Sequence, residues 1–442
     1  MRILWLFTRL KSAIRLPLGA VALLLFGIPL ARAQPQQLSG APVLPLPASP
    51  RRLAEFVAVA RQNSPLLRDL ALQVGQNRLD SLRRRAQNLP QVNLSMAAVA
   101  SPAIGPLGYD QAVTNGGNYV GVGQATQPLF NRAQRQNDYR TLSNAGQVLR
   151  NSGRISALDL RRSVTDQFLT AYAAQSQLTF SRTLLGQLRQ QDEILRKLVN
   201  AGIFKQTQYL SFYLSVRTQE VSVEQNRLAY RRELGTLRYL AGVADTTLLP
   251  IEPPGTPVRR PLTGLSAPAL RQYVLDSLRL TLDRRAVDLY YRPKVSAVLD
   301  AGLQSSQPQF VALSRSLGLS GGLLLSVPIF DGHQRQLQYQ RIALGEQSRR
   351  GYREFLGVQR RQQHEQLLGL VRASDALLAR IREQLRVADA LVQAGRQQLG
   401  TGELAILDYL NLVTNYRTLQ FSLIQAENDR LRSLYALDYL GE

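Results

Sequence analysis

The feature that most constrains this chain is an internal repeat, because a repeat determines the architecture before any local pattern is considered. Three matched segments occur in the same order in both halves: Pro128-Leu129-Phe130-Asn131 with Pro328-Ile329-Phe330-Asp331, Gly202 with Gly402, and Gln208-Tyr209-Leu210-Ser211 with Asp408-Tyr409-Leu410-Asn411. Each match lies 200 residues further along the chain. The sequence therefore predicts two copies of one structural unit, over 51–244 and 266–442, joined by a Pro-rich linker over 245–265.

The first 33 residues predict a cleaved signal peptide. Basic residues precede an apolar run over 16–30, and the small-residue site Ala31-Arg32-Ala33 follows it. The alternative is a membrane-anchoring helix, but the apolar run is shorter than the ~20 residues that span a bilayer. We therefore expect an exported protein that begins near Gln34, with an N-terminal extension over 34–50.

Very long helices are predicted in both copies. Leu378, Ile381 and Leu385 begin a row of apolar residues spaced alternately by three and four, which is the pattern of a coiled-coil seam. The predicted long helices cover 132–200 and 204–240 in the first copy, and 332–399 and 403–439 in the second. A helix of nearly 70 residues would extend roughly 100 Å at ~1.5 Å per residue. Such helices must pack along equally long partners.

Charged residues become rare in two segments where apolar and polar residues alternate. Residues 91–130 contain one charged residue, Asp110, and residues 295–327 contain two, Asp300 and Arg315. The alternation predicts strands near 91–102, 117–127, 294–304 and 316–327. A soluble hairpin with one wet face is the alternative, but charge depletion together with an export signal favours strands that cross a membrane.

Two details of these strands are less determined by the pattern. Gly121 and Gly123 leave open which face of the second strand is apolar, so its assignment depends mainly on the repeat. Four strands are also too few, because a membrane barrel needs at least ~8 and an open edge in lipid is forbidden. Several chains must therefore share one barrel. We further expect Pro128 and Pro328 to stop the strands where the helices begin, which places Pro128, Phe130, Pro328 and Phe330 at a barrel-to-helix junction.

Composition argues against several other functions. The chain has no Cys and only two His, His333 and His364, so no metal site and no thiol chemistry are expected. No nucleotide-binding loop or nucleophile and base arrangement occurs, which predicts a non-enzyme without cofactors. The net charge of +23 invites a nucleic-acid interpretation. However, the basic residues are spread along helices without interleaved aromatic residues, and no nucleic-acid partner is expected.

The residues resemble the TolC-like outer-membrane efflux protein family over essentially the whole mature chain. The segments that carry the resemblance are Ser326 to Gly332, its counterpart Gln127 to Arg132, Leu89-Pro90, and Gly402 with Asp408 to Asn411. The resemblance implies a mixed α and β membrane protein that forms a homotrimer. A twelve-stranded barrel in the outer-membrane lipid would continue into a long periplasmic α-helical tunnel.

The same resemblance assigns roles to the helix reversals. Those expected to contact a periplasmic adaptor are Ala201, Gly202, Ile203, Thr401, Gly402 and Glu403, and those expected at the periplasmic entrance are Asp408, Asn411, Gln208 and Ser211. Both Gly residues could equally serve only the sharp turn. Only one of the four entrance residues, Asp408, is acidic, which leaves the ion selectivity and the strength of the gate open.

The function implied is a passive exit duct of a tripartite efflux or type I secretion system. An adaptor would connect it to an inner-membrane pump of the RND, ABC or MFS type, and the cargo and the pump class remain open. The alternatives are a periplasmic coiled-coil adaptor or scaffold without a pore, and a basic helical protein that binds nucleic acid. The alternating, charge-poor segments disfavour both.

Overall fold

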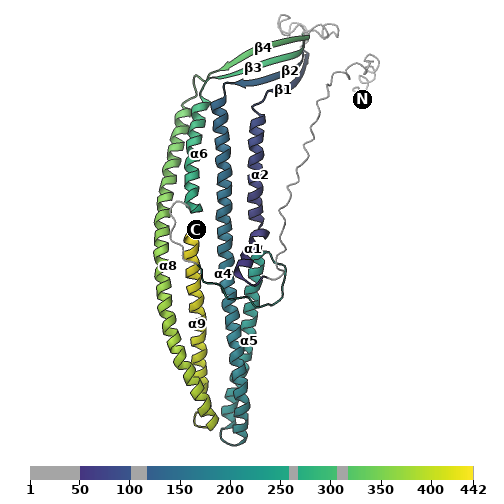
Figure 1. Cartoon of the computed structure of the whole chain (residues 1–442). Coiled ribbons are helices and arrows are strands. Elements are labelled where there is room, and N and C mark those ends of the chain that lie inside the picture. The colour runs from purple at the N-terminus through teal and green to yellow at the C-terminus, as the bar shows by residue number, and fades with distance from the viewer. Residues whose placement is uncertain (1–49, 101–116, 258–266, 306–316, 442) are drawn as a thin grey trace, which may run out of the picture. The chain divides into compact units, whose positions relative to one another are not determined.

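The computed structural model describes residues 50–100, 117–257, 267–305 and 317–441. All of them belong to a unit that begins at Ala48. The predicted signal peptide lies outside the described residues, as do Asp110, Arg315 and nearly all of the predicted N-terminal extension. Within the described part the chain is a mixed α and β protein, with one four-stranded antiparallel sheet at one end of a set of long helices (Figure 1).

The two repeats contain the same order of elements. The first has α1 (Leu53–Asn63), α2 (Pro65–Ala86), β1 (Gln91–Ala100), β2 (Gly117–Leu129), α4 (Arg132–Asn200) and α5 (Gln206–Ala241). The second has α6 (Pro268–Tyr290), β3 (Lys294–Ser305), β4 (Leu317–Ser326), α8 (Gln334–Thr401) and α9 (Ile406–Gly441). Helix α8 starts two residues later than the sequence indicated, because Gly332 and His333 adopt positive φ angles of 61° and 65°. The Asp331 carboxylate then accepts hydrogen bonds from the backbone N–H groups of His333 (3.0 Å) and Arg335 (2.8 Å).

The register of the sheet determines which residues share a face, because directly paired residues point to the same side. Leu94 pairs with Gly123, Gly123 with Ala301, and Ala301 with Leu319. The apolar face contains Val92, Leu94, Met96, Gly121, Gly123, Ala125, Leu299, Ala301, Leu303, Leu317, Leu319, Leu323 and Leu325. The opposite face carries a polar row across all four strands: Asn93, Gln124, Asp300 and Ser320. Gly121 and Gly123 therefore lie on the apolar face, which the sequence had left open.

Pro128 does not stop its strand, and that expectation was wrong. Strand β2 runs to Leu129, and Pro128 pairs with Ser296 of β3. Pairing of β2 with β1 has already ended at Thr126. Pro128 therefore lies where β2 has a partner on one side only, the position in a sheet where a missing N–H is tolerated. In the second repeat β4 ends at Ser326, two residues before Pro328.

The long helices form two antiparallel hairpins, α4 with α5 and α8 with α9 (Figure 1). A core of buried residues from both hairpins joins them, including Leu178, Leu188, Leu399 and Val413. Apolar side chains are buried there because one stripe of each helix faces its partner. None of the helices in the described part of the chain is both long and apolar enough to cross a membrane.

The described part of the Pro-rich linker, residues 245–257, packs on the helices rather than hanging free. Ile251 is 4% exposed, and its backbone exchanges two hydrogen bonds with the Gln175 side chain of α4, at 2.7 and 2.9 Å. The Tyr230 hydroxyl of α5 donates to the carbonyl of Leu249 (2.6 Å). The linker therefore binds to both α4 and α5.

Candidate functional site at the helix-hairpin tips

Both hairpins reverse through the same turn. Gly202 has a φ of 79° and Gly402 a φ of 84°, in the left-handed region that favours glycine. The backbone N–H of Ile203 donates to Leu198 (3.0 Å), and that of Glu403 donates to Gln398 (2.9 Å). This is the hydrogen bond that closes a helix ending in glycine. The two tips lie together at the end of the helices away from the sheet (Figure 1).

The residues expected at the adaptor-facing tips all lie on these two turns. Ala201 and Ile203 are exposed beside Gly202, and Thr401 and Glu403 are exposed beside Gly402, which is half-buried. The two tips also touch each other, because a Cβ added to Gly402 would lie 2.8 Å from a methyl group of Ile203. Gly402 therefore serves both the turn and the close approach of the other tip.

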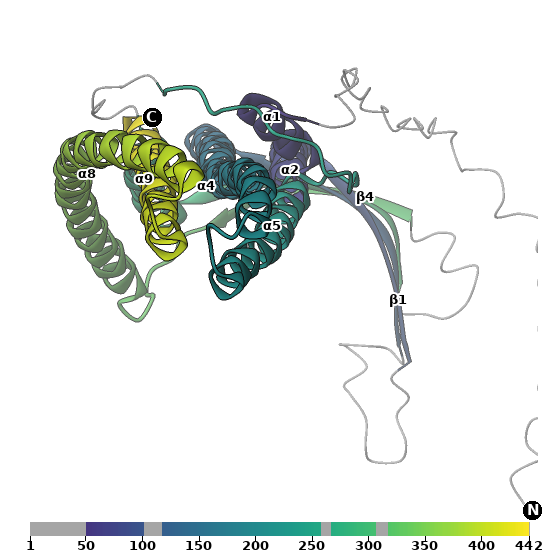
Figure 2. The same cartoon turned by 90° about the horizontal axis from the view of Figure 1, so that it is seen from below.

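A shared apolar core lies directly behind the tips. The rings of Phe212 in α5 and Tyr409 in α9 stack with centroids 6.5 Å apart, and both side chains are buried. Leu195, Leu399 and Ile406 are at most 1% exposed in the same cluster. Figure 2 shows α9 and the α4–α5 hairpin side by side when viewed from the tip end. Burial of this size makes the two tips one packed unit.

The expected entrance residues form one exposed strip on each hairpin. Asp408 and Asn411 lie one turn apart on α9, Gln208 and Ser211 lie one turn apart on α5, and all four are exposed. The Gln208 side chain accepts a hydrogen bond from the backbone N–H of Lys205 (3.2 Å), which caps α5. Asp408 occupies the first turn of α9, where the helix dipole favours a negative charge. The strip on α9 therefore carries the acid, and the strip on α5 is neutral.

Sequence reasoning missed a glycine that shapes the second tip. A Cβ added to Gly395 would lie 2.8 Å from Leu412 and 3.5 Å from Tyr409. Its counterpart in the repeat is Leu195, which is fully buried. Comparing the two copies position by position would have revealed this exchange of a buried leucine for glycine.

Two polar features accompany this packing. The guanidinium of Arg396 donates to the Gln190 side-chain oxygen of the other hairpin (3.4 Å). Burial raises the pKa of the Tyr409 hydroxyl, and the charge of Arg396 opposes that rise.

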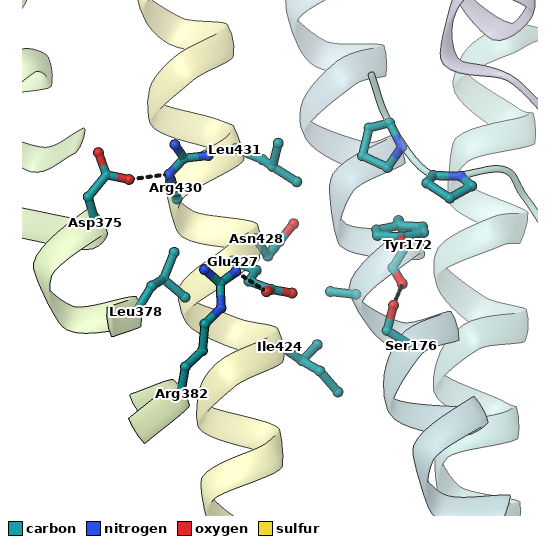
Figure 3. Close-up of a pocket in the computed structure, with 13 residues that line it drawn as sticks. Tyr172, Ser176, Asp375, Leu378, Arg382, Ile424, Glu427, Asn428, Arg430 and Leu431 are labelled. Carbon is teal, nitrogen blue, oxygen red and sulfur yellow. Dashed lines mark hydrogen bonds and ion pairs between the residues drawn. The ribbon is translucent and has the colours of Figure 1, made fainter. Parts of the chain in front are cut away.

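A polar cavity of about 370 Å³ separates the hairpins further up (Figure 3). Its charged groups are paired: Arg382 with Glu427 at 2.8 Å, and Arg430 with Asp375 at 2.5 Å. Because these charges already satisfy one another, we do not assign the cavity to a ligand. Above it the hairpins meet again, where Arg161 of α4 pairs with Asp438 of α9 at 3.1 Å.

Large apolar side chains are uncovered where the strands meet the helices. Phe130, Ile329 and Phe330 are 91%, 97% and 83% exposed. Phe130 also has a positive φ of 54°, which is strained for a residue with a Cβ. Pro328 is exposed beside them. Exposed apolar groups of this size indicate a surface that another molecule or a lipid phase covers.

No protein-family model matches the chain, and no curated protein matches its sequence. Solved structures do match its fold. A membrane protein from Pseudomonas aeruginosa has a TM-score of 0.72 and 16% identity, over 91% of this chain and 95% of that one. The outer membrane protein VceC from Vibrio cholerae has a TM-score of 0.71 and 14% identity, over 88% of this chain and 96% of that one. The MtrE outer membrane channel of Neisseria gonorrhoeae in its open state has a TM-score of 0.71 and 14% identity, over 91% of this chain and 93% of that one.

These matches cover nearly the full length of both partners in each comparison, so the sheet, the long helices and their connections are shared together. The chain therefore has the fold of the TolC-like outer-membrane channels, as the sequence resemblance implied.

Proposed function

We propose that this chain is one subunit of a trimeric outer-membrane channel. The observation that carries the proposal is the amphipathic sheet. One face carries mainly apolar side chains on all four strands, and the other carries the polar row from Asn93 to Ser320. On β4, Leu319 and Leu323 are 80% and 74% exposed. A sheet whose apolar face is exposed instead of packed on a core, and whose other face is polar, suits the wall of a membrane pore.

The edges of the sheet support assembly from several chains. Within the described residues, β1 and β4 each pair on one side only, so their outer backbone groups need partners in lipid. A second copy can supply β4 to β1 and so extend the sheet. Three copies of four strands each close a twelve-stranded barrel. The helices of the three copies then continue as a tunnel into the periplasm.

The tips and the polar row define the two ends of the duct. The tips, from Ala201 to Ile203 and from Thr401 to Glu403, would receive a periplasmic adaptor. The strips with Asp408 and Asn411, and with Gln208 and Ser211, would line the entrance. An inner-membrane pump supplies the energy and selects the cargo, while this chain provides a passive path and catalyses no reaction. The chain reaches the outer membrane through a cleaved signal peptide at 1–33.

Mass and conductance of the purified protein test this function. The mature protein, extracted from outer membranes in detergent, is expected to have the mass of three chains and to open stepwise conductances in planar bilayers. A water-soluble monomer that opens no channel would overturn the proposal.

A further inference from the structure

Three asparagines of α4, spaced seven residues apart, bind the backbone of α6. Asn137, Asn144 and Asn151 donate their side-chain N–H groups to the carbonyls of Leu282 (3.2 Å), Leu275 (3.1 Å) and Pro268 (2.9 Å). The three amides are at most 2% exposed. Their acceptors are also seven residues apart, in the opposite direction. These three bonds therefore fix the antiparallel register of α4 on α6, as a buried polar side chain does in a coiled coil.

The repeat places a matching set of residues on two other helices, α8 and α2. Each position of α4 matches the position of α8 that lies 200 residues later in the sequence. Each position of α2 matches the position of α6 that lies 203 residues later. The counterparts of the three asparagines are Leu337, Leu344 and Gly351 on α8, and those of the three acceptors are Leu79, Leu72 and Pro65 on α2.

The packing of the two repeats agrees with this correspondence to within one residue along the long helices. A Cβ added to Gly146 of α4 would meet the Asn77 side chain of α2 at 2.7 Å. A Cβ added to Gly345 of α8 would meet Leu280 of α6, the counterpart of Asn77, at 3.5 Å; Gly345 lies one residue before Glu346, the counterpart of Gly146. Helix α2 thus lies on α4 as α6 lies on α8. The four helices form a row in the order α2, α4, α6 and α8 (Figure 1).

The two ends of this row carry uncovered leucines. In its middle, Leu275 and Leu282 are 4% exposed, because α6 is packed between α4 and α8. Their counterparts Leu72 and Leu79 on the outer face of α2 are 59% and 64% exposed. At the other end, Leu337 and Leu344 of α8 are 60% and 66% exposed.

We propose that α8 of one copy packs on α2 of the next copy in the register that α4 adopts on α6. Leu337 then lies opposite Leu79, Leu344 opposite Leu72, and Gly351 opposite Pro65. The occupant of this surface is a second copy of this chain, and the inference rests on the trimer proposed above. Repetition of the contact joins the helices of three copies into one closed ring.

There is a physical reason why α8 has leucines at positions where α4 has asparagines. The contact of α4 with α6 forms within one chain and needs mainly a defined register, which the amides supply. A contact between chains must also offset the translational and rotational freedom lost on association. Burial of apolar side chains provides that free energy. The leucines therefore lie on the surface that joins copies, and the amides lie within the chain.

Disulfide cross-linking tests the register, because the chain has no Cys. We expect the double variant Leu79→Cys with Leu337→Cys to form covalent dimers and trimers on oxidation. The second matched pair, Leu72→Cys with Leu344→Cys, should do the same. A bond within one chain is excluded, because α4 and α6 lie between α2 and α8 and neighbouring helix axes are ~8–10 Å apart.

The control pair is Leu72→Cys with Leu337→Cys. It is displaced by seven residues, or roughly 10 Å at ~1.5 Å per residue, beyond the ~7 Å limit between Cα atoms in a disulfide. Cross-linking of both matched pairs without the control pair supports the proposal. Equal cross-linking of the matched and control pairs overturns the proposed register. So does the absence of cross-linking in variants that still conduct as trimers when reduced. Neither result contradicts the proposed channel. A monomer without conductance overturns both.

Discussion

The ring of Phe212 stacks on the ring of Tyr409, and this contact joins the α5 side of one hairpin to the α9 side of the other. The centroids are 6.5 Å apart and neither side chain is more than 4% exposed. Positions 212 and 409 come from different repeats, so the contact couples the two halves of the duplicated chain. The contact therefore packs the two tips against each other.

Removal of either ring should loosen the tips. In a double-mutant cycle of Phe212→Ala and Tyr409→Ala, we expect a coupling of ~1 kcal/mol, the usual worth of a buried aromatic pair. The measurement is the free energy of local opening from amide hydrogen exchange at the tips. Leu214→Ala is the control, because Leu214 lies on α5 and is 66% exposed. Additive effects of the two ring deletions would argue against the coupling.

Two glycines of the second tip should respond in opposite ways to alanine. Gly402→Ala forces a Cβ into the left-handed region and against Ile203, which costs about 1–2 kcal/mol. Gly400→Ala lies within α8 with open space around its Cβ and should stabilise the helix by about 0.5–1 kcal/mol. Hydrogen exchange of the last turn of α8 measures both. Equal effects of the two substitutions would show that the turn conformation does not matter.

A change of charge at the entrance should alter ion preference. Asp408→Asn removes the acid of the α9 strip, and a ring of such acids favours cations. We therefore expect a lower ratio of cation to anion permeability, measured from the reversal potential in a salt gradient. Gln208→Glu should raise that ratio, because a glutamate at this position keeps the cap of α5 and adds an acid. An unchanged reversal potential in both variants would remove these residues from the entrance.

The contact between α6 and α8 should weaken in acid. Hydrogen bonds from Arg349 and Arg350, at 2.7 and 2.9 Å, lower the pKa of Glu346 from 4.5 to about 2. Arg349 also donates to the backbone of Tyr273 in α6 (3.2 Å). Because the pKa of Glu346 is depressed in the folded chain, its stabilising effect is present above about pH 4.5 and is lost as the pH falls toward 2.

Thermal unfolding of Glu346→Gln measures this effect. The variant should unfold at a lower temperature than the wild type at pH 7, and the difference should disappear as the pH approaches 2. Glu365→Gln, with a side chain 77% exposed, is the matched control and should follow the wild type. A constant difference at every pH would contradict the assignment.

Much of this fold could be predicted from sequence because the signals are local or repeated. Alternation and seven-residue spacing place the strands and long helices within a few residues of their positions in the structure. Strand faces were harder: Gly121 and Gly123 have no side chains to show a face, and only their partners Leu303 and Leu94 assign them. The expectation for Pro128 failed because β2 at Pro128 is paired with β3 only, and a strand with one unpaired side tolerates proline there.

The contacts between repeats could not be predicted in the same way. Nothing in the sequence indicates that Phe212 meets Tyr409, because their separation along the chain is large and no periodic pattern links them. The asparagines of α4 likewise do not indicate their contact with α6, since an asparagine in the sequence of a helix resembles an exposed surface residue. The tip glycines were found because both copies carry them, whereas Gly395 was missed because only one copy does.

The most direct test of the channel uses neighbouring residues on opposite faces of β4. Ser320 belongs to the polar row and Leu319 to the apolar face, so the proposed barrel exposes the first to the pore and the second to lipid. Because the native chain has no Cys, Ser320→Cys and Leu319→Cys each present a single thiol. The measurement is single-channel conductance before and after a charged, water-soluble thiol reagent is added. We predict a stepwise fall in conductance for Ser320→Cys and no change for Leu319→Cys; a fall for Leu319→Cys alone, or for neither, would contradict the account.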